Sequence, residues 1–267
     1  MKRALALLSV SIILLIAVGV TFAQDTREVN KSGAFSRDGR FSLDTYKGSI
    51  KIVPWDKSEI EIHAVIEADG NSRYDRDMVE DTEIRIDLSS NTARVKTDYD
   101  HAKHRHHGFL GLFTYDSDNL PFVHYTIKLP NTAHVVIKDY KSQTTVDGLQ
   151  ADLELETYKG EVSVERLSGG IDLKTYKGEG HVNFTSLTSR SRVETYKGEI
   201  ELSLPRGKGY DLDASIGRHA RLQSDVEWAR DSKSSRKHGY ETHSSVNGGG
   251  PELRLKSDHG TIRVYER

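Results

Sequence analysis

A tetrapeptide that recurs along the chain restricts the folds that this sequence can adopt. Thr-Tyr-Lys-Gly starts at residues 45, 157, 175 and 195, and a degenerate copy, Asp-Tyr-Lys-Ser, starts at residue 139. The copies from residue 139 onward follow one another after 18, 18 and 20 residues, a further slot falls at Ala214, and a last copy, Ser257-Asp258-His259-Gly260, closes the chain. A sustained period of 18–20 residues is typical of a stacked repeat architecture.

Each period also alternates between apolar and polar residues. Leu153, Leu155 and Thr157 share one parity, whereas Glu154 and Glu156 take the other, and the alternation resumes after the motif glycine. Period-2 alternation indicates half-buried strands. The glycine supplies a positive φ or a tight corner between two strands. Each period therefore encodes two short strands and two corners.

The repeat predicts an all-β fold, a β-solenoid-like stack of 18–20-residue two-strand repeats. A single repeat cannot bury its apolar side alone, whereas parallel strands stacked ~4.8 Å apart bury leucine on leucine and valine on valine. The alternative is a β-sandwich, which alternating short strands also suit. A sandwich would not explain the near-identical corner sequences.

The N-terminus has the layout of an export signal. Residues 1–23 begin with two basic residues, continue as an apolar run and end in small residues before a cleavage site after Ala23. The alternative is an uncleaved membrane anchor, since the run nearly reaches the ~20 residues that a span needs. Either reading places the rest of the chain outside the cytoplasm, in the periplasm or at the cell surface.

The remainder, residues 24–267, is expected to be a single β-repeat domain with two long loops. The repeat is interrupted at about 67–122, where a charged stretch and a His-rich stretch occur, and at about 224–250, where Gly and Ser are frequent. Both interruptions resemble excursions from one continuous core, and loops of this kind often carry function.

Composition excludes several classes of function. The chain has no cysteine, so disulfides, thiolate metal sites and a cysteine nucleophile are excluded. It has 38 Lys and Arg against 40 Asp and Glu, without the basic excess of a general nucleic-acid binder. The chain has no HExxH, GxSxG or Walker motif, and no GxGxxG after a strand. We therefore expect a non-enzymatic protein without a cofactor.

A histidine cluster in the first interruption is a candidate metal site. Imidazoles and the nearby carboxylates suit Zn, Ni or Cu. A lysine and an arginine stand between the histidines and would repel a cation, so the alternative is a solvated, pH-sensitive loop. The candidate ligands are His101, His104, His106 and His107.

The motif residues themselves form the candidate ligand-binding site. Because each lies one period from the next, the tyrosines should stack in a ladder with a parallel row of lysines, which the row of Gln143, Glu161, Glu179 and Glu199 could neutralise. Such a ladder either stiffens the edge of the stack or binds a polymer such as a glycan, with aromatic faces against sugar rings and lysines against anionic groups. The residues concerned are Tyr140, Tyr158, Tyr176, Tyr196, Lys141, Lys159, Lys177 and Lys197.

The repeats resemble the DUF4097 family of β-strand repeat proteins, whose members are candidate adhesins. The resemblance lies in TYKGEVSVERLSGGIDLKTYKGEGHVNF, in the closing GGGPELRLKSDHGTIRVYER, and in FSLDTYKGSIKIVPWDKSEIEIHA with its Pro54-Trp55-Asp56. It covers roughly residues 33–66 and 123–267 and does not extend to the His-rich insert.

The resemblance implies an exported, non-enzymatic, adhesin-like binding or scaffolding protein of the cell envelope. The partner is then an envelope glycan or another envelope protein, and not nucleic acid, with membrane contact only if the N-terminal segment is uncleaved. Some relatives are encoded near envelope-stress regulators. The alternative is therefore a structural or regulatory envelope-stress component that acts through protein–protein contacts of its loops.

Overall fold

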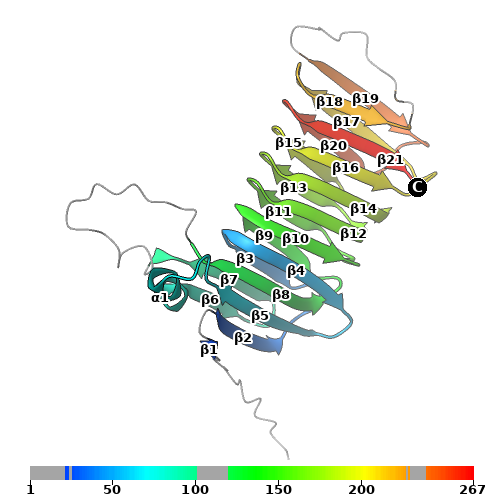
Figure 1. The fold of residues 1–267 in the computed structure, drawn as a ribbon. Helices are drawn as coiled ribbons and strands as arrows, with labels where there is room; N and C mark the ends of the chain where they lie inside the picture. The colour runs from blue at the N-terminus through cyan, green and yellow to red at the C-terminus, as the bar shows by residue number, and fades with distance from the viewer. Residues whose placement is uncertain (1–21, 24–25, 101–119, 227, 229–238) are drawn as a thin grey trace, which may run out of the picture.

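The chain passes back and forth between two long β-sheets, so that each coil adds one strand to each sheet (Figure 1). The computed structural model describes residues 22–23, 26–100, 120–226, 228 and 239–267. Each central coil consists of two consecutive strands, one in each sheet. These coils are β9 (His134–Asp139) and β10 (Lys141–Asp147), β11 (Leu153–Thr157) and β12 (Glu161–Gly169), β13 (Ile171–Thr175) and β14 (Glu179–Leu187), and β15 (Ser191–Thr195) and β16 (Glu199–Leu204).

Successive coils stack in parallel and in register. Leu155 of β11 lies opposite Ile137 on one side and Leu173 on the other. The predicted all-β, β-solenoid-like fold is confirmed. Two sheets do face each other across one core, but corners join them coil by coil, and this connection accounts for the repeated corner sequence that a β-sandwich leaves unexplained.

The spatial order of the coils departs from the sequence order at the C-terminal end. We expected the slot at Ala214 to follow the coil of Thr195, but β20 (Glu252–Ser257) and β21 (Thr261–Glu266) pair with β15 and β16 there. The coil of β17 (Tyr210–Ile216) and β18 (Arg221–Ser224) lies outside them. This order places the strand with less apolar surface at the edge. β18 is short and mostly exposed, which suits an edge strand, whereas every second residue of β21 is buried or partly buried, which suits an inner strand.

The N-terminal coils are also permuted. β3 (Arg40–Asp44) and β4 (Lys47–Trp55) pair in parallel with β9 and β10. Outside them lie β7 (Thr92–Asp98) and β8 (Phe122–Pro130), which form a further coil. In its described parts, the expected long loop at 67–122 is therefore largely ordered structure, and residues 101–119 lie outside the described residues. The sequence did not reveal this coil because β7 repeats the strand alternation without a Lys-Gly corner after it.

Antiparallel strands cover both sheets at the N-terminal end of the stack and one sheet at the C-terminal end. At the N-terminal end, β2 (Thr26–Ala34), which also pairs with β1 (Phe22–Ala23), and β5 (Glu59–Glu67) extend the sheet of β8, and β6 (Glu83–Leu88) pairs with β7. At the other end, β19 (Tyr240–Val246) pairs with β17, so the second expected loop, 224–250, also contains a strand. Such caps cover sheet edges that would otherwise be open to other chains.

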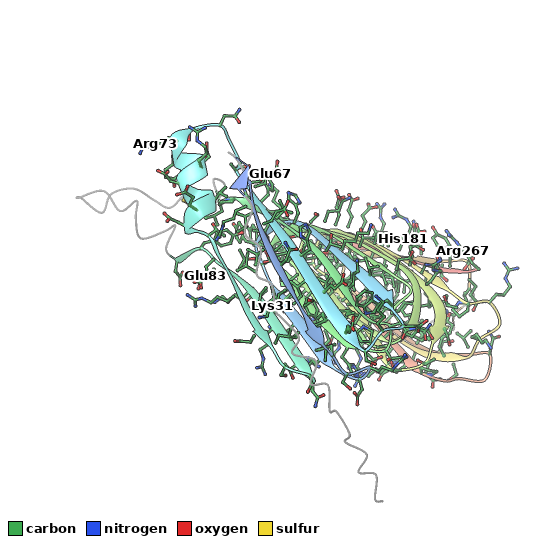
Figure 2. All side chains as sticks on the ribbon, turned by 90° about the horizontal axis from the view of Figure 1, so that it is seen from below. Lys31, Glu67, Arg73, Glu83, His181 and Arg267 are labelled. Carbon is green, nitrogen blue, oxygen red and sulfur yellow. The ribbon has the colours of Figure 1, made fainter. Side chains whose placement is uncertain are left out.

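One short helix, α1 (Arg73–Asp81), follows β5 and stands beside its end (Figure 2). Ser72 and Asp75 form a reciprocal capping box at its start, and Met78 and Val79 are buried. No helix among the described residues is long and apolar enough to cross a membrane.

The core consists of rows of aliphatic side chains between the two sheets. Leu155 is 2% exposed, and its neighbours in the row, Ile137 and Leu173, are fully buried. Each such side chain contributes about 1.5–3 kcal/mol when removed from water. Residues of the opposite parity, such as Glu156, point outward and are exposed.

We expect Leu155→Asp to lower the free energy of unfolding by about 3–5 kcal/mol, because it places an unpaired charge between two coils. Glu156→Ala, the matched change at the next residue, should cost less than about 0.5 kcal/mol. Urea titration of both variants checks this. Equal losses would contradict the assigned parity.

Candidate functional site

The three Thr-Tyr-Lys-Gly copies from Thr157 onward turn between the sheets through the same hydrogen-bonded corner. The Thr157 hydroxyl accepts a hydrogen bond from the backbone N–H of Gly160 at 2.9 Å, and Thr175 and Thr195 make the same bond at 2.8 Å. A backbone N–H donates to the carbonyl of the tyrosine one coil before it, at 2.8–2.9 Å, at Lys141, Lys159, Lys177 and Lys197. The inter-coil hydrogen bonding therefore continues through the corner and holds successive motifs in register.

The motif glycines are required by the close approach of successive corners. A Cβ added to Gly178 would lie 2.1 Å from the carbonyl oxygen of Gly160, and one added to Gly198 would lie 2.0 Å from that of Gly178. Neither residue has a positive φ. The structure thus supports the tight-corner role for Gly178 and Gly198, whereas Gly48 of the first copy has a positive φ of 134°.

The motif tyrosines stack face to face along this corner. Their ring centroids are 4.6–4.8 Å apart and their planes lie within 3–9° of parallel. We call this set the tyrosine ladder: Tyr46, Tyr140, Tyr158, Tyr176 and Tyr196. Four of the five were expected from their spacing, and the structure brings them together. Tyr46 joins them because β3 and β4 stack on β9 and β10.

Further rings extend the ladder at both ends. Tyr99, at the end of the outer N-terminal coil, meets Tyr46 edge to face at 6.5 Å. His259 lies 5.0 Å from Tyr196, and His219 stacks on His259 at 5.4 Å. The spacing of the motif tyrosines did not reveal these members. The last copy, which contains His259, was visible in the sequence, but its place beside Tyr196 was not.

Stacking leaves the ladder no free inner face. Each of Tyr140, Tyr158 and Tyr176 has another ring on both sides at less than 5 Å, and Tyr196 lies between Tyr176 and His259. The expected stacking of sugar rings on these faces is therefore excluded for the inner rings. What the ladder offers to a ligand is ring edges and phenol hydroxyls, and Tyr176 is 36% exposed.

The motif lysines lie against the ladder. The Lys159 ammonium is 5.7 Å from the ring centroid of Tyr140 and 5.6 Å from that of Tyr158, and Lys177 and Lys197 sit over their own tyrosines at 5.8 and 5.6 Å. Cation–π contacts at exposed sites contribute about 0.5–1 kcal/mol. In the described part of the chain, no ion pair joins these lysines to the glutamate row, so the expected neutralisation is not made by direct contact.

An open groove of about 380 Å³ runs beside the ladder, and we call it the ladder groove. One side consists of the edges of Tyr158, Tyr176 and Tyr196. The other consists of charged side chains from the outer face of the sheet of β11, β13, β15 and β20. These charged residues are Glu156, Lys174, Glu194 and Lys256. The motif spacing did not reveal this charged row, although the four residues occupy the same position in their repeats.

Asp139 lines the ladder groove at the position that threonine holds in the other motifs. Its Oδ2 accepts a hydrogen bond from the backbone N–H of Ser142 at 2.5 Å, which reproduces the threonine corner. Burial raises the pKa of its carboxyl group to about 6, against the opposing effect of hydrogen bonds from Ser142 and Thr157. A threonine at this position would make the corner without a charge.

We expect Asp139→Asn to stabilise the protein at pH 8 and to have little effect at pH 4. The carboxyl group has a pKa of 3.8 in the unfolded chain and about 6 in the folded protein. Its contribution to the stability of the folded state is therefore fully present below pH 3.8 and is lost as the pH rises through about 6. Removing the charge should therefore add about 2 kcal/mol at pH 8. Thermal unfolding at both pH values checks this, and an equal gain at both would contradict it.

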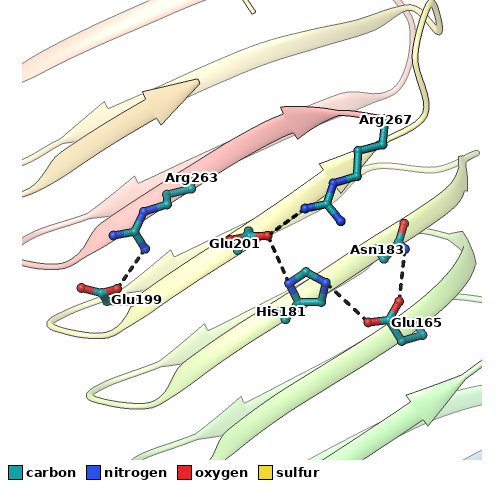
Figure 3. Close-up of polar contacts among 7 residues, drawn as sticks. All are labelled: Glu165, His181, Asn183, Glu199, Glu201, Arg263 and Arg267. Carbon is teal, nitrogen blue, oxygen red and sulfur yellow. Dashed lines mark hydrogen bonds and ion pairs between the residues drawn. The ribbon is translucent and has the colours of Figure 1, made fainter. Parts of the chain in front are cut away.

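A second polar cluster occupies the outer face of the other sheet (Figure 3). His181 lies 3.4 Å from Glu165 and 3.5 Å from Glu201, and Arg263 pairs with Glu199 at 2.9 Å. Exposed pairs of this kind contribute about 0–1 kcal/mol each. Most charged members of the cluster are already paired with each other across coils, so the cluster is better suited to tying coils together than to binding a ligand.

The candidate metal ligands His101, His104, His106 and His107 lie outside the described residues. Within the described ranges, no group of three or more His, Asp or Glu side chains is placed to hold a metal ion.

One protein-family model matches the repeat region of the chain. Residues 133–265 match the family Toastrack DUF4097. The chain belongs to the DUF4097 family through this segment, which confirms the resemblance found in the repeats. The match contains all the coils from β9 onward, and β3 and β4 add a coil of the same design outside it.

Several solved bacterial proteins align with most of this chain at low sequence identity. A candidate cell adhesion protein from Clostridium sporogenes is 11% identical, with a TM-score of 0.48, over 91% of this chain and 100% of that one. A candidate adhesin from Bacteroides fragilis is 11% identical, with a TM-score of 0.31, over 90% and 97%. A candidate lipid-binding protein from Parabacteroides distasonis is 11% identical, with a TM-score of 0.26, over 89% and 96%. No curated protein matches the chain.

Proposed function

We propose that this protein is an exported, non-enzymatic binding protein of the cell envelope, adhesin-like in its use of a repeat surface, and that the ladder groove is its binding site. The observation that carries the proposal is the groove itself, where phenol edges and charged groups recur at the same position in successive coils. A surface with the periodicity of the stack suits an extended ligand, which can make the same contact several times.

The geometry also supports a binding role for the ladder in addition to stiffening. A ladder that served only to stiffen the corner would need stacked rings and nothing beside them. Here the edges of Tyr158, Tyr176 and Tyr196 line an open groove, whereas Tyr46 and Tyr140 are not among its lining residues. The site is thus local to one stretch of the ladder.

The alternative, an envelope-stress component that acts through its loops, gains less support. The described parts of both interruptions form strands or a helix that complete the ends of the stack. These parts therefore have a structural role that does not require a protein partner.

The test is retention of the mature chain on an envelope preparation from its native host. Replacing Tyr158, Tyr176 and Tyr196 together by Phe keeps the stacked rings and removes three hydroxyls from the groove. We expect retention to fall at least about tenfold, since each lost hydrogen bond to a ligand contributes about 0.5–1.5 kcal/mol.

The matched control is Tyr46→Phe with Tyr140→Phe, the same chemical change on the same ladder but outside the groove. The control should bind like the parent chain, and circular dichroism should show that both variants are folded. Full retention by the triple variant would overturn the ladder groove as the site. Loss of retention only on deletion of residues 229–238 would favour the loop alternative.

Export and cleavage of the N-terminal segment are tested by a separate measurement. The intact mass of the protein from the envelope fraction of the native host should correspond to a chain that starts at Gln24, after removal of residues 1–23. A retained Met1 would instead indicate an uncleaved anchor. Recovery of the full-length chain from the cytoplasm alone would contradict export.

A further inference from the structure

The charged side of the ladder groove alternates in sign from coil to coil. Glu156 lies in register with Lys174, Lys174 with Glu194, and Glu194 with Lys256. The alternation continues beyond the groove, because Lys138 is in register with Glu156 on its other side. Adjacent strands are ~4.8 Å apart, so opposite charges recur at that spacing along the stack.

An alternating row discriminates against a uniformly charged polymer. A linear chain with one charge per coil would meet a like charge at every second coil, whichever sign it carried, and like charges in contact weaken binding. A chain of uncharged hydroxyl groups meets no such penalty, because hydroxyls donate to carboxylates and accept from ammonium groups.

The ends of the groove add a bias against anions. Asp139 lines one end of the groove, one coil before Glu156, and Asp258 lines the other end, in the coil of Lys256. The groove thus presents four carboxylates and two ammonium groups. A polyanion is therefore disfavoured more strongly than a polycation.

The aromatic side restricts the ligand in a different way. The inner rings have no free face, so neither a nucleobase nor the apolar face of a sugar can stack on them. Their hydroxyls, one per coil, can exchange hydrogen bonds with a ligand that lies along the stack. The groove therefore favours hydrogen bonding over stacking.

We propose that the ladder groove binds a neutral, hydroxyl-rich linear polysaccharide that lies along the axis of the stack and spans the coils of Tyr158, Tyr176 and Tyr196. This inference rests on the proposed function and adds the chemical class of the ligand. It also adds a charge selectivity, in the order neutral, then cationic, then anionic.

The experiment compares three oligosaccharides of equal length by calorimetry with the mature chain: a β-1,4-linked glucose hexamer, a glucosamine hexamer and a galacturonic acid hexamer. At low ionic strength we expect the neutral hexamer to bind most tightly and the acidic one at least about fivefold more weakly. The difference should shrink at ~0.15 M salt, where exposed charges are largely screened.

The matched variants alter charge without touching the tyrosines. Glu156→Gln with Glu194→Gln removes two carboxylates from the groove and should raise the affinity for the acidic hexamer about fivefold, while that for the neutral hexamer changes less than about twofold. Glu161→Gln with Glu179→Gln removes the same charge from the outer face of the other sheet and should leave both affinities unchanged.

The outcomes separate this inference from the proposed function. Tighter binding of either charged hexamer, or an equal gain from both pairs of glutamine variants, overturns the neutral-glycan assignment and leaves the groove as a binding site. If no hexamer binds while the chain is still retained on the envelope preparation through the groove tyrosines, the ligand class is wrong and the function stands. If the groove tyrosines also prove irrelevant to retention, both fail.

Discussion

The parallel hydrogen bonding between coils is the interaction on which the rest of this structure depends. It runs through both sheets and also through the corner between them, where the motif lysine N–H groups from Lys141 to Lys197 donate to tyrosine carbonyls of the preceding coil. Because the backbones are held in register, every side-chain position becomes a row. Aliphatic rows form the core, a tyrosine row forms the ladder, and a row of alternating charge forms one side of the groove.

The same register also limits what the rows can do. Rings held less than 5 Å apart and nearly parallel cover each other, so an aromatic row of this kind loses the flat faces that usually bind sugars. The ladder thus stabilises its corner and still leaves one polar edge for a ligand. Structural and binding roles are compatible here because they use different parts of the same rings.

The sequence predicts most of the fold, because a period of 18–20 residues with period-2 alternation leaves few alternatives. It also predicts the ladder, since equal spacing becomes adjacency once coils stack. It fails where the order of stacking is decided by pairing between distant segments. β7 lacks the corner sequence after its threonine, and nothing local shows that β20 lies between β15 and β17. The charged row was missed for a related reason, since its alternation in sign becomes visible only across strands.

The permuted C-terminal coil has a consequence for the order in which the chain can fold. Among the strands that the structure describes, β18 is hydrogen-bonded only to β21, and β17 only to β20 and to the cap strand β19. During synthesis, residues 210–224 therefore emerge well before the strands on which they stack, and they have no parallel neighbour until residues 252–266 have left the ribosome. Vectorial growth can proceed coil by coil as far as β16, and the last two coils must then assemble together. The C-terminal end of the stack is thus completed from within, when β20 and β21 enter between the coil of β15 and β16 and the coil of β17 and β18.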